Sequence, residues 1–153
     1  MSVDPIPSEY HSVTPYLIVS SAAEAIAFYV NAFGATEVLR LVGPGGSVGH
    51  AEVQIGDSRV MMADENADFG AFGPKHYGGS PCHLMIYVED VDAVFQQAVD
   101  AGAEVLREPH DQFYGDRSCM ISDPFGHHWS LATHFKDVSQ EEAQRLFDEM
   151  CGE

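Results

Sequence analysis

The chain has 153 residues, the size of one ordinary domain. Hydrophobic residues make up 45% of it and charged residues 20%, a composition typical of a folded protein rather than a disordered one. The 24 acidic residues outnumber the 7 Lys and Arg residues, and the formal net charge is −17. This charge repels phosphate, so it argues against a nucleic-acid partner and against an anionic membrane surface.

The sequence gives no sign of a membrane or secreted protein. No apolar run approaches the about 18–20 residues that a membrane span requires. The first residues, MSVDPIPSEYHS, carry acid and proline where a secretory signal has basic residues and an apolar stretch. Cys82, Cys119 and Cys151 are odd in number and far apart, which suits a reducing compartment. We therefore expect a cytoplasmic protein.

The first half of the chain predicts a strand, a helix and three further strands. The helix begins after Ser21, whose hydroxyl can accept from the backbone N–H of Glu24 in a capping box. It ends at Gly34, a residue suited to a left-handed helix end. Apolar and alternating runs predict the strands at 14–19, 37–42, 49–55 and 58–63.

The second half predicts the same order of elements. Its helix begins after Asp90 and ends at Gly102. A glycine-rich linker separates the halves, and a further helix begins after Ser139 in another capping box. The predicted strands of this half are 83–88, 104–107, 117–122 and 127–133.

The two halves also repeat each other in sequence. GATEVLR at 34–40 matches GAEVLR at 102–107 with one gap, and each copy follows a helix. A βαβββ unit therefore occurs twice. We predict one α+β domain over residues 1–153, built from unit one at 12–64, a linker at 65–80, unit two at 81–135 and a C-terminal helix at 139–151.

This duplicated unit resembles the vicinal oxygen chelate superfamily, which includes glyoxalase I, extradiol dioxygenases and the fosfomycin- and bleomycin-resistance proteins. The resemblance covers about residues 12–135 and is closest to the small single-domain members called PhnB-like. It implies a curled mixed sheet around a cavity, with helices outside, and a homodimer. The segments that carry it are AIAFY at 25–29, AFGA at 32–35, VEDVD at 88–92 and DPFGH at 123–127.

Strand alternation indicates which side chains face that cavity. The apolar side of each strand should pack on the helices, so the other side faces inward. The strand after Arg117 alternates too weakly for its inward face to be assigned. The predicted wall is polar and rich in histidine. Its members are Thr14, Tyr16 and Ile18 on the first strand, His50, Glu52 and Gln54 on the third, His83, Met85 and Tyr87 on the fifth, and His128, Ser130, Ala132 and His134 on the last.

Metal-dependent members of the superfamily hold a divalent ion with His, Glu or Gln at four inward positions. The resemblance places these positions at Thr14, at Met62 give or take one residue, at His83 and at Ser130. Among these side chains, only the His83 imidazole suits Zn, Ni, Mn or Fe. We therefore expect the usual divalent site to be missing.

The leading hypothesis is a protein that binds a small organic molecule. It would sequester that ligand, as bleomycin-resistance proteins do, or perform acid–base chemistry on it with His83 and Glu52 as the catalytic pair. Arg117 is either an anchor for a ligand carboxylate or phosphonate or a partner of Asp116 in an ion pair. The predicted ligand-binding residues are Tyr16, His50, Tyr87, Arg117 and His128.

Two alternatives belong to other classes. In the first, His83 joins His50, Glu52 or His128 in a rewired divalent-metal site, and the chain is a lyase or dioxygenase. In the second, the chain is a stable dimer without chemistry, and its acidic helix at 140–150 is the contact surface.

Overall fold

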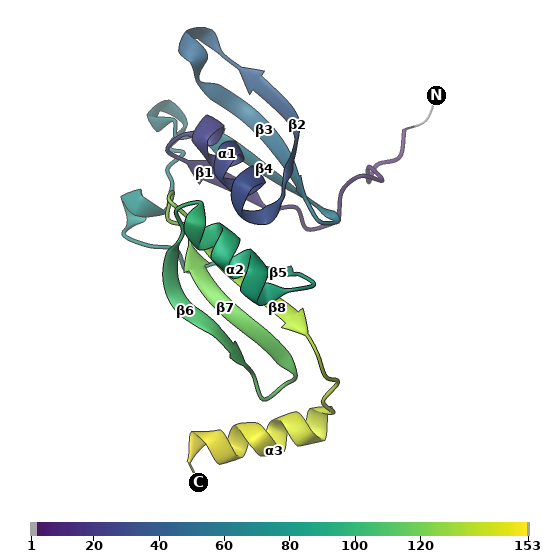
Figure 1. Ribbon diagram of the computed structural model, residues 1–153. Helices are drawn as coiled ribbons and strands as arrows, with labels where there is room; N and C mark the ends of the chain where they lie inside the picture. The colour runs from purple at the N-terminus through teal and green to yellow at the C-terminus, as the bar shows by residue number, and fades with distance from the viewer. Residues whose placement is uncertain (1–2, 153) are drawn as a thin grey trace.

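A computed structural model of the chain describes residues 3–152. Two βαβββ units follow one another along the molecule, and a C-terminal helix lies beyond the second unit (Figure 1). The predicted α+β fold and its repeated order of elements are confirmed. Within residues 3–152, no helix is both long and apolar enough to cross a membrane.

Unit 1 is a four-stranded sheet with one helix on it. The strand order is β1-β4-β3-β2, in which β1 runs parallel to β4 and the other pairs are antiparallel. The elements are β1 (Tyr16–Val19), α1 (Ala22–Phe33), β2 (Thr36–Val42), β3 (Val48–Ile55) and β4 (Ser58–Asp64), with a 3₁₀ turn, η1 (Pro44–Gly46), between β2 and β3.

Unit 2 repeats this plan as β5-β8-β7-β6, again with its first and last strands parallel. The strand predicted at 104–107 extends to Asp111, because two register shifts and Pro109 break the alternation that would have revealed the rest. The elements are β5 (His83–Tyr87), α2 (Val91–Asp100), β6 (Glu104–Asp111), β7 (Asp116–Ser122) and β8 (His128–His134). The linker contains two 3₁₀ turns, η2 (Ala67–Phe69) and η3 (Pro74–Tyr77).

The predicted helix starts and the predicted end of α1 are confirmed, whereas α2 ends at Asp100 with Ala101 as its cap, before the predicted Gly102. The Ser21 hydroxyl accepts from the Glu24 backbone N–H at 3.3 Å, and Asp90 caps α2 in the same way through the N–H of Ala93. Gly34 ends α1 at φ 66°, in the left-handed region where a side chain is strained. Local sequence chemistry therefore sets where each helix starts and where α1 stops.

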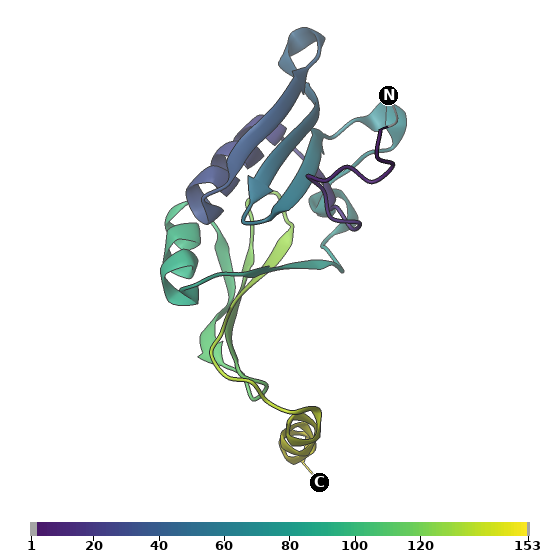
Figure 2. The same ribbon diagram turned by 90° about the vertical axis from the view of Figure 1, so that its right-hand side faces the viewer.

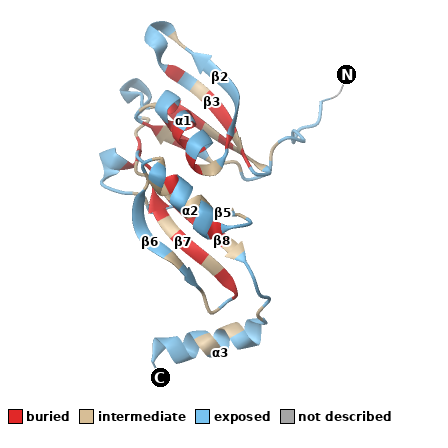
Figure 3. Ribbon diagram, viewed as in Figure 1, coloured by how far each residue is buried: buried red, intermediate tan, exposed pale blue. Residues whose placement is uncertain are grey.

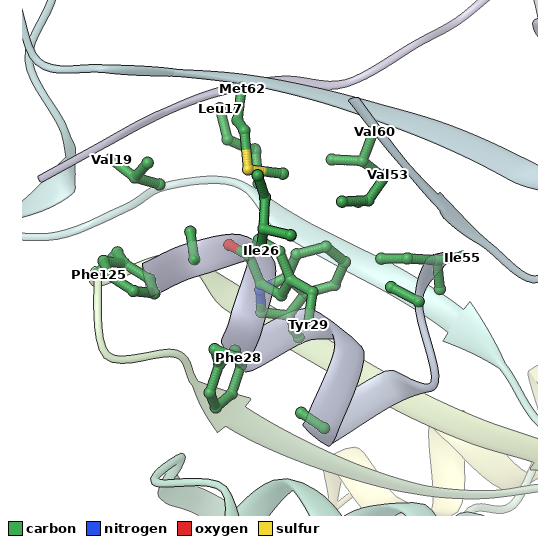
Figure 4. Packing of buried hydrophobic residues seen from close by; sticks show 14 of the residues in the cluster. Leu17, Val19, Ile26, Phe28, Tyr29, Val53, Ile55, Val60, Met62 and Phe125 are labelled. Carbon is green, nitrogen blue, oxygen red and sulfur yellow. The ribbon is translucent and has the colours of Figure 1, made fainter. Parts of the chain in front are cut away.

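The main core lies between the helices and the sheets. Tyr29 and Ile26 of α1 pack among apolar side chains of β1, β3 and β4, with Met62 and Val53 above them (Figure 4). Trp129 of β8 completes the cluster, with its ring 5.3 Å from that of Tyr29. Buried positions concentrate on α1, β3 and β7, whereas β2 and most of β6 are exposed (Figure 3).

The two sheets remain separate within residues 3–152, since no backbone pairing joins them. The units meet through their helices, with α1 beside α2 (Figures 1 and 2). We call the side of each sheet that faces away from its helix the open face. These are the faces that strand alternation assigned to the cavity wall.

The C-terminal helix, α3 (Gln140–Cys151), is held through the turn between β6 and β7. The carbonyl of Gly115 accepts from the backbone N–H groups of Phe135 and Lys136, at 3.0 and 3.2 Å. A Cβ on Gly115 would lie 1.8 Å from the Lys136 carbonyl oxygen, so only glycine permits this crossing. One aromatic contact, between the rings of Phe113 and Phe147 at 6.1 Å, links α3 to that turn.

Candidate functional site

The open face of unit 1 carries a chain of hydrogen-bonded polar side chains. Tyr16 and Glu52 occupy the same row of the sheet, separated by Met61 of β4. His50 lies two residues before Glu52 on β3, on the same face, and it contacts both side chains. Its Nδ1 is 2.8 Å from the Tyr16 hydroxyl, and its Nε2 is 3.0 Å from a Glu52 carboxylate oxygen.

Glu52 is the buried end of this chain. It is 4% exposed, and its second carboxylate oxygen accepts from the Tyr10 hydroxyl at 2.6 Å. Burial raises the pKa of Glu52, but hydrogen bonds from Tyr10 and His50 and the charge of Arg59 together bring that pKa below its ordinary value. Glu52 is therefore ionised at neutral pH and acts as an acceptor for both neighbours.

Exposure increases from Glu52 outward. The His50 side chain is 24% exposed and Tyr16 is 49% exposed. Burial and the nearby Glu52 charge raise the pKa of Tyr16, so its phenol stays protonated. The arrangement connects a buried carboxylate to a solvent-facing phenol through one imidazole.

The open face of unit 2 has its own buried carboxylate. Asp116 of β7 is 4% exposed, and it accepts from the Tyr87 hydroxyl at 2.9 Å. Its other oxygen is 2.7 Å from Nδ1 of His134, whose Nε2 is 2.9 Å from Asp137. Hydrogen bonds to Asp116 and then to Asp137 raise the pKa of His134. In unit 2 the imidazole of His134, at the end of β8, therefore bonds both Asp116 and the segment before α3.

His83 and His128 also come together on this face. They are register partners on β5 and β8, and their rings meet edge to face at 5.2 Å. Nδ1 of His128 is buried without a hydrogen-bond partner among the described residues. The predicted catalytic pair is not in contact, because His83 belongs to this sheet whereas Glu52 belongs to the other and is bonded to Tyr10 and His50.

Arg117 lies on the other side of β7, with the residues that pack toward α2. Its guanidinium donates to Asp92 at 2.7 and 2.9 Å and to Asp111 at 3.0 Å. The Asp116 ion pair, considered as the alternative to a ligand anchor, does not form, because neighbouring strand residues point to opposite faces and Asp116 bonds Tyr87 and His134 instead. We do not carry Arg117 into the candidate site.

The residues present do not fit the divalent metal that the resemblance implies. Of the four expected positions, Thr14 and Ser130 offer only hydroxyls, and the methionine on the open face is Met61, because Met62 is fully buried in the core. His83 alone keeps a suitable donor. Within residues 3–152, no three His, Cys, Asp or Glu side chains form a group that could hold a metal ion.

Sequence reasoning missed two contributors to these networks. Tyr10 precedes the first strand and lies outside the repeat, so no periodic signal marked it. Asp116 was considered only as a partner of Arg117, although its inward position follows once β7 is known to begin at Asp116. The sequence did not assign the two faces of β7, because its alternation is weak. The structure assigns them, since Cys119 and Ile121 are fully buried on the helix side.

A cleft of about 500 Å³ lies between the turn joining β3 to β4 and the strand β5. Its wall is largely apolar, and it meets the open face of unit 2 at two residues of β5, Met85 and Tyr87. The other apolar residues that line it include Val60, Leu84, Ile86 and Trp129.

Comparison with known proteins places this geometry in a family. The model of the Glyoxalase/Bleomycin resistance protein/Dioxygenase superfamily matches residues 10–131. The "Uncharacterized protein Mb0911c" of Mycobacterium bovis is 42% identical over 136 residues, which cover 87% of this chain and 90% of that protein.

Solved structures agree with this assignment. TioX from Micromonospora sp. ML1 has a TM-score of 0.64 at 26% identity, over 82% of this chain and 99% of that one. A PhnB protein from Bacillus cereus has a TM-score of 0.62 at 21% identity, over 80% and 99%, and this likeness shows the fold alone. The chain thus belongs to the glyoxalase/bleomycin resistance protein/dioxygenase superfamily, as its duplicated βαβββ pattern and landmark segments predicted.

Proposed function

We propose that this protein binds a small, planar organic molecule against its open faces. The observation that carries the proposal is that the open face of each unit presents an exposed tyrosine whose hydroxyl is fixed by a network ending at a buried carboxylate. Tyr16 is held through His50 by Glu52, and Tyr87 is held directly by Asp116.

Such networks are costly unless they are fully satisfied, because a buried carboxylate loses its hydration. Glu52 and Asp116 recover that loss through two protein partners each. The result is a pair of aromatic rings in fixed positions with their faces still in solvent. Fixed aromatic surfaces with oriented polar atoms are typical of small-molecule sites.

The charge of the protein favours a neutral or cationic ligand over an anionic one. The net charge of −17 repels anions at long range. Three of the five arginines are already ion-paired with carboxylates: Arg40 with Glu37, Arg117 with Asp92 and Asp111, and Arg145 with Glu142 and Glu149. This argument replaces the predicted carboxylate or phosphonate ligand with an uncharged aromatic one.

The proposed site is shared between two copies of the chain. β1 and β5 are edge strands, and an exposed strand edge is readily paired by another chain. Tyr16, Met85 and Tyr87 are 49%, 50% and 63% exposed on the faces beside these edges. A second copy of the chain would cover these side chains and enclose the ligand. This arrangement would be the homodimer that the resemblance to the family implies.

Calorimetric titration with 4-nitroanisole, a neutral planar probe, tests the binding proposal. We expect saturable binding, with Tyr16→Ala raising Kd about fivefold or more, since a lost aromatic contact costs about 1 kcal/mol. The matched control is Tyr77→Ala, because Tyr77 is 68% exposed in η3 and belongs to neither open face. Equal losses in the two variants, or no binding at all, would contradict the proposal.

Light scattering after size exclusion tests the dimer. We expect a mass twice the 16.7 kDa of one chain. Met85→Glu should give monomers, because it places a carboxylate on the open face of unit 2 beside the edge of β5. Met150→Glu on α3, at a methionine that is 67% exposed, is the control. Dissociation by Met150→Glu alone would instead make the acidic helix the contact surface.

A further inference from the structure

The ionised carboxylate of Glu52 sets the first donor in the chain of hydrogen bonds that leads to Tyr16. An ionised carboxylate can only accept hydrogen bonds. Nε2 of His50 therefore carries a hydrogen and donates a hydrogen bond to Glu52. With a neutral ring, Nδ1 is the acceptor for the Tyr16 hydroxyl, which lies 2.8 Å away. The remaining lone pair of the Tyr16 oxygen is free to accept from a ligand.

This order of groups is that of a general-base relay. A buried carboxylate orients an imidazole, and the imidazole accepts from a hydroxyl that faces the ligand, which is the logic of nucleophile–base–acid triads. The gradient of burial supports it, since Glu52 is 4% exposed whereas Tyr16 is 49% exposed. The Tyr87 hydroxyl donates directly to Asp116, so unit 2 places no imidazole between its phenol and its carboxylate.

We propose that Glu52, His50 and Tyr16 form a proton relay that deprotonates a weakly acidic phenol bound on the open face of unit 1. This inference rests on the proposed ligand site and adds an activity to it. Tyr16 is the catalytic residue, because it touches the ligand. His50 takes part in the same step, because its Nδ1 accepts the proton from Tyr16. Glu52 is a positioning residue that acts through His50.

The proton transfer balances without an oxidant or reductant. The ligand O–H bond breaks, its electron pair stays on the ligand oxygen, and the proton passes to the Tyr16 oxygen. Tyr16 gives its own proton to Nδ1 of His50, which becomes an imidazolium beside the Glu52 carboxylate. Tyr16 ends as it began, and the net change is one proton moved from the ligand to His50.

The class of ligand follows from the charges around the relay. A ligand that is already anionic is repelled by the net charge of −17, so the proton has to be removed after a neutral molecule has bound. Arg59 of β4 supplies a positive charge near Glu52, the buried end of the relay. Its guanidinium lies 5.9 Å from the centre of the Tyr10 ring, and its buried Nε has no hydrogen-bond partner among the described residues.

Absorbance of bound 4-nitrophenol measures the relay, because the phenolate absorbs at longer wavelength than the phenol. We expect wild-type protein to lower the apparent pKa of the bound probe by about one unit, a tenfold gain in the phenolate-to-phenol ratio. Tyr16→Phe, His50→Gln and Glu52→Gln should each abolish this shift. Tyr77→Phe, which changes a tyrosine outside both open faces, should retain it.

Two further measurements distinguish failure of the relay from failure of the ligand site. Binding of 4-nitroanisole, which has no acidic proton, should persist in Tyr16→Phe and His50→Gln, so loss of ionisation is separated from loss of the site. Nitrogen NMR should show His50 as the Nε2–H tautomer, and Glu52→Gln should disturb that preference. The relay is overturned by a neutral bound nitrophenol, by an unchanged shift in His50→Gln, or by His50 in the Nδ1–H or imidazolium form at neutral pH.

Discussion

The two units share a backbone plan but have different chemistry on their open faces. Each sheet has the same strand order, and each anchors a tyrosine to a buried carboxylate. In unit 1 the imidazole of His50 stands between Tyr16 and Glu52, whereas in unit 2 Tyr87 donates straight to Asp116 and His134 bonds the same carboxylate from the far side. The two units therefore share the scaffold, and single side chains decide whether an imidazole lies between the tyrosine and the buried carboxylate.

The last turn of each unit differs in a second way. The turn between β3 and β4 carries Asp57, whose side chain is 88% exposed and lies near His11. The turn between β7 and β8 carries Asp123, which is 4% exposed and accepts from Tyr29 of α1 at 2.7 Å and from Trp129 at 2.9 Å. The aspartate in the last turn of unit 1 is therefore exposed to solvent. The aspartate in the corresponding turn of unit 2 is buried and connects unit 2 to α1 of unit 1.

The largest expected effect is that of Asp123→Ala. Its carboxylate also accepts from the backbone N–H groups of Phe125 and His127, so removal leaves four donors without their partner. We expect a loss of roughly 3–5 kcal/mol in the free energy of unfolding, measured by urea denaturation.

Asp57→Ala is the matched control in the other unit. It should leave the denaturation midpoint almost unchanged, because exposed ion pairs contribute little. Comparable losses for Asp57→Ala and Asp123→Ala would show that the two turns do not differ as described.

The hairpin glycines give the next comparison. Gly115→Ala places a methyl group in contact with the Lys136 carbonyl at a φ of 94°, so we expect a loss of roughly 2–4 kcal/mol and displacement of α3. Gly45→Ala in unit 1 also has a positive φ, 81°, but no neighbour within 4 Å, so it should cost only about 1–2 kcal/mol. Denaturation midpoints of the two variants test this order, which fails if Gly45→Ala is the more damaging.

Glu52→Gln should cost roughly 1–3 kcal/mol at neutral pH, because it weakens two hydrogen bonds to a buried carboxylate. The hydrogen bonds that lower the pKa of Glu52 stabilise the fold above the unfolded value of about 4.3, and that stabilisation is lost as pH falls through the folded pKa. The difference between wild type and variant should therefore shrink in acid. A penalty that is unchanged at low pH would contradict the ionised state of Glu52.

The smallest expected effect lies at His134. Hydrogen bonds to Asp116 and Asp137 raise its pKa, so its charged form stabilises the fold fully below the unfolded value of about 6.5. This contribution is lost as pH rises through the folded pKa. The melting temperature of wild type minus that of His134→Gln should therefore decrease with rising pH from 6 upward, and a constant or increasing difference would rule out the protonated pair.

Much of the fold could be predicted from the sequence, because its signals are local. Ser21, Gly34, Asp90 and Ser139 mark helix ends through chemistry that acts within one turn of helix. Alternation in β3 likewise placed His50 and Glu52 on the same face as Tyr16, where they meet. Alternation in β5 and β8 placed His83 and His128 together on the open face of unit 2.

The connections between side chains could not be predicted in this way. Pairing His83 with Glu52 assumed that both units line a single hollow within one chain, whereas the two sheets of a single chain do not pair. Tyr10 reaches Glu52 across 42 positions of sequence, and Asp116 meets His134 from another strand. Such partners depend on tertiary register, which alternation within one strand does not encode.

Methyl NMR of protein labelled at methionine tests the location of the ligand site most directly, because the methionines sample distinct surroundings. Met61 lies between Tyr16 and Glu52, Met85 lies on the open face of unit 2, Met62 is buried in the core and Met150 is exposed on α3. Titration with 4-nitroanisole should shift the Met61 and Met85 signals and leave those of Met62 and Met150 in place. A shift confined to Met150 or Met62 would contradict a ligand site on the open faces.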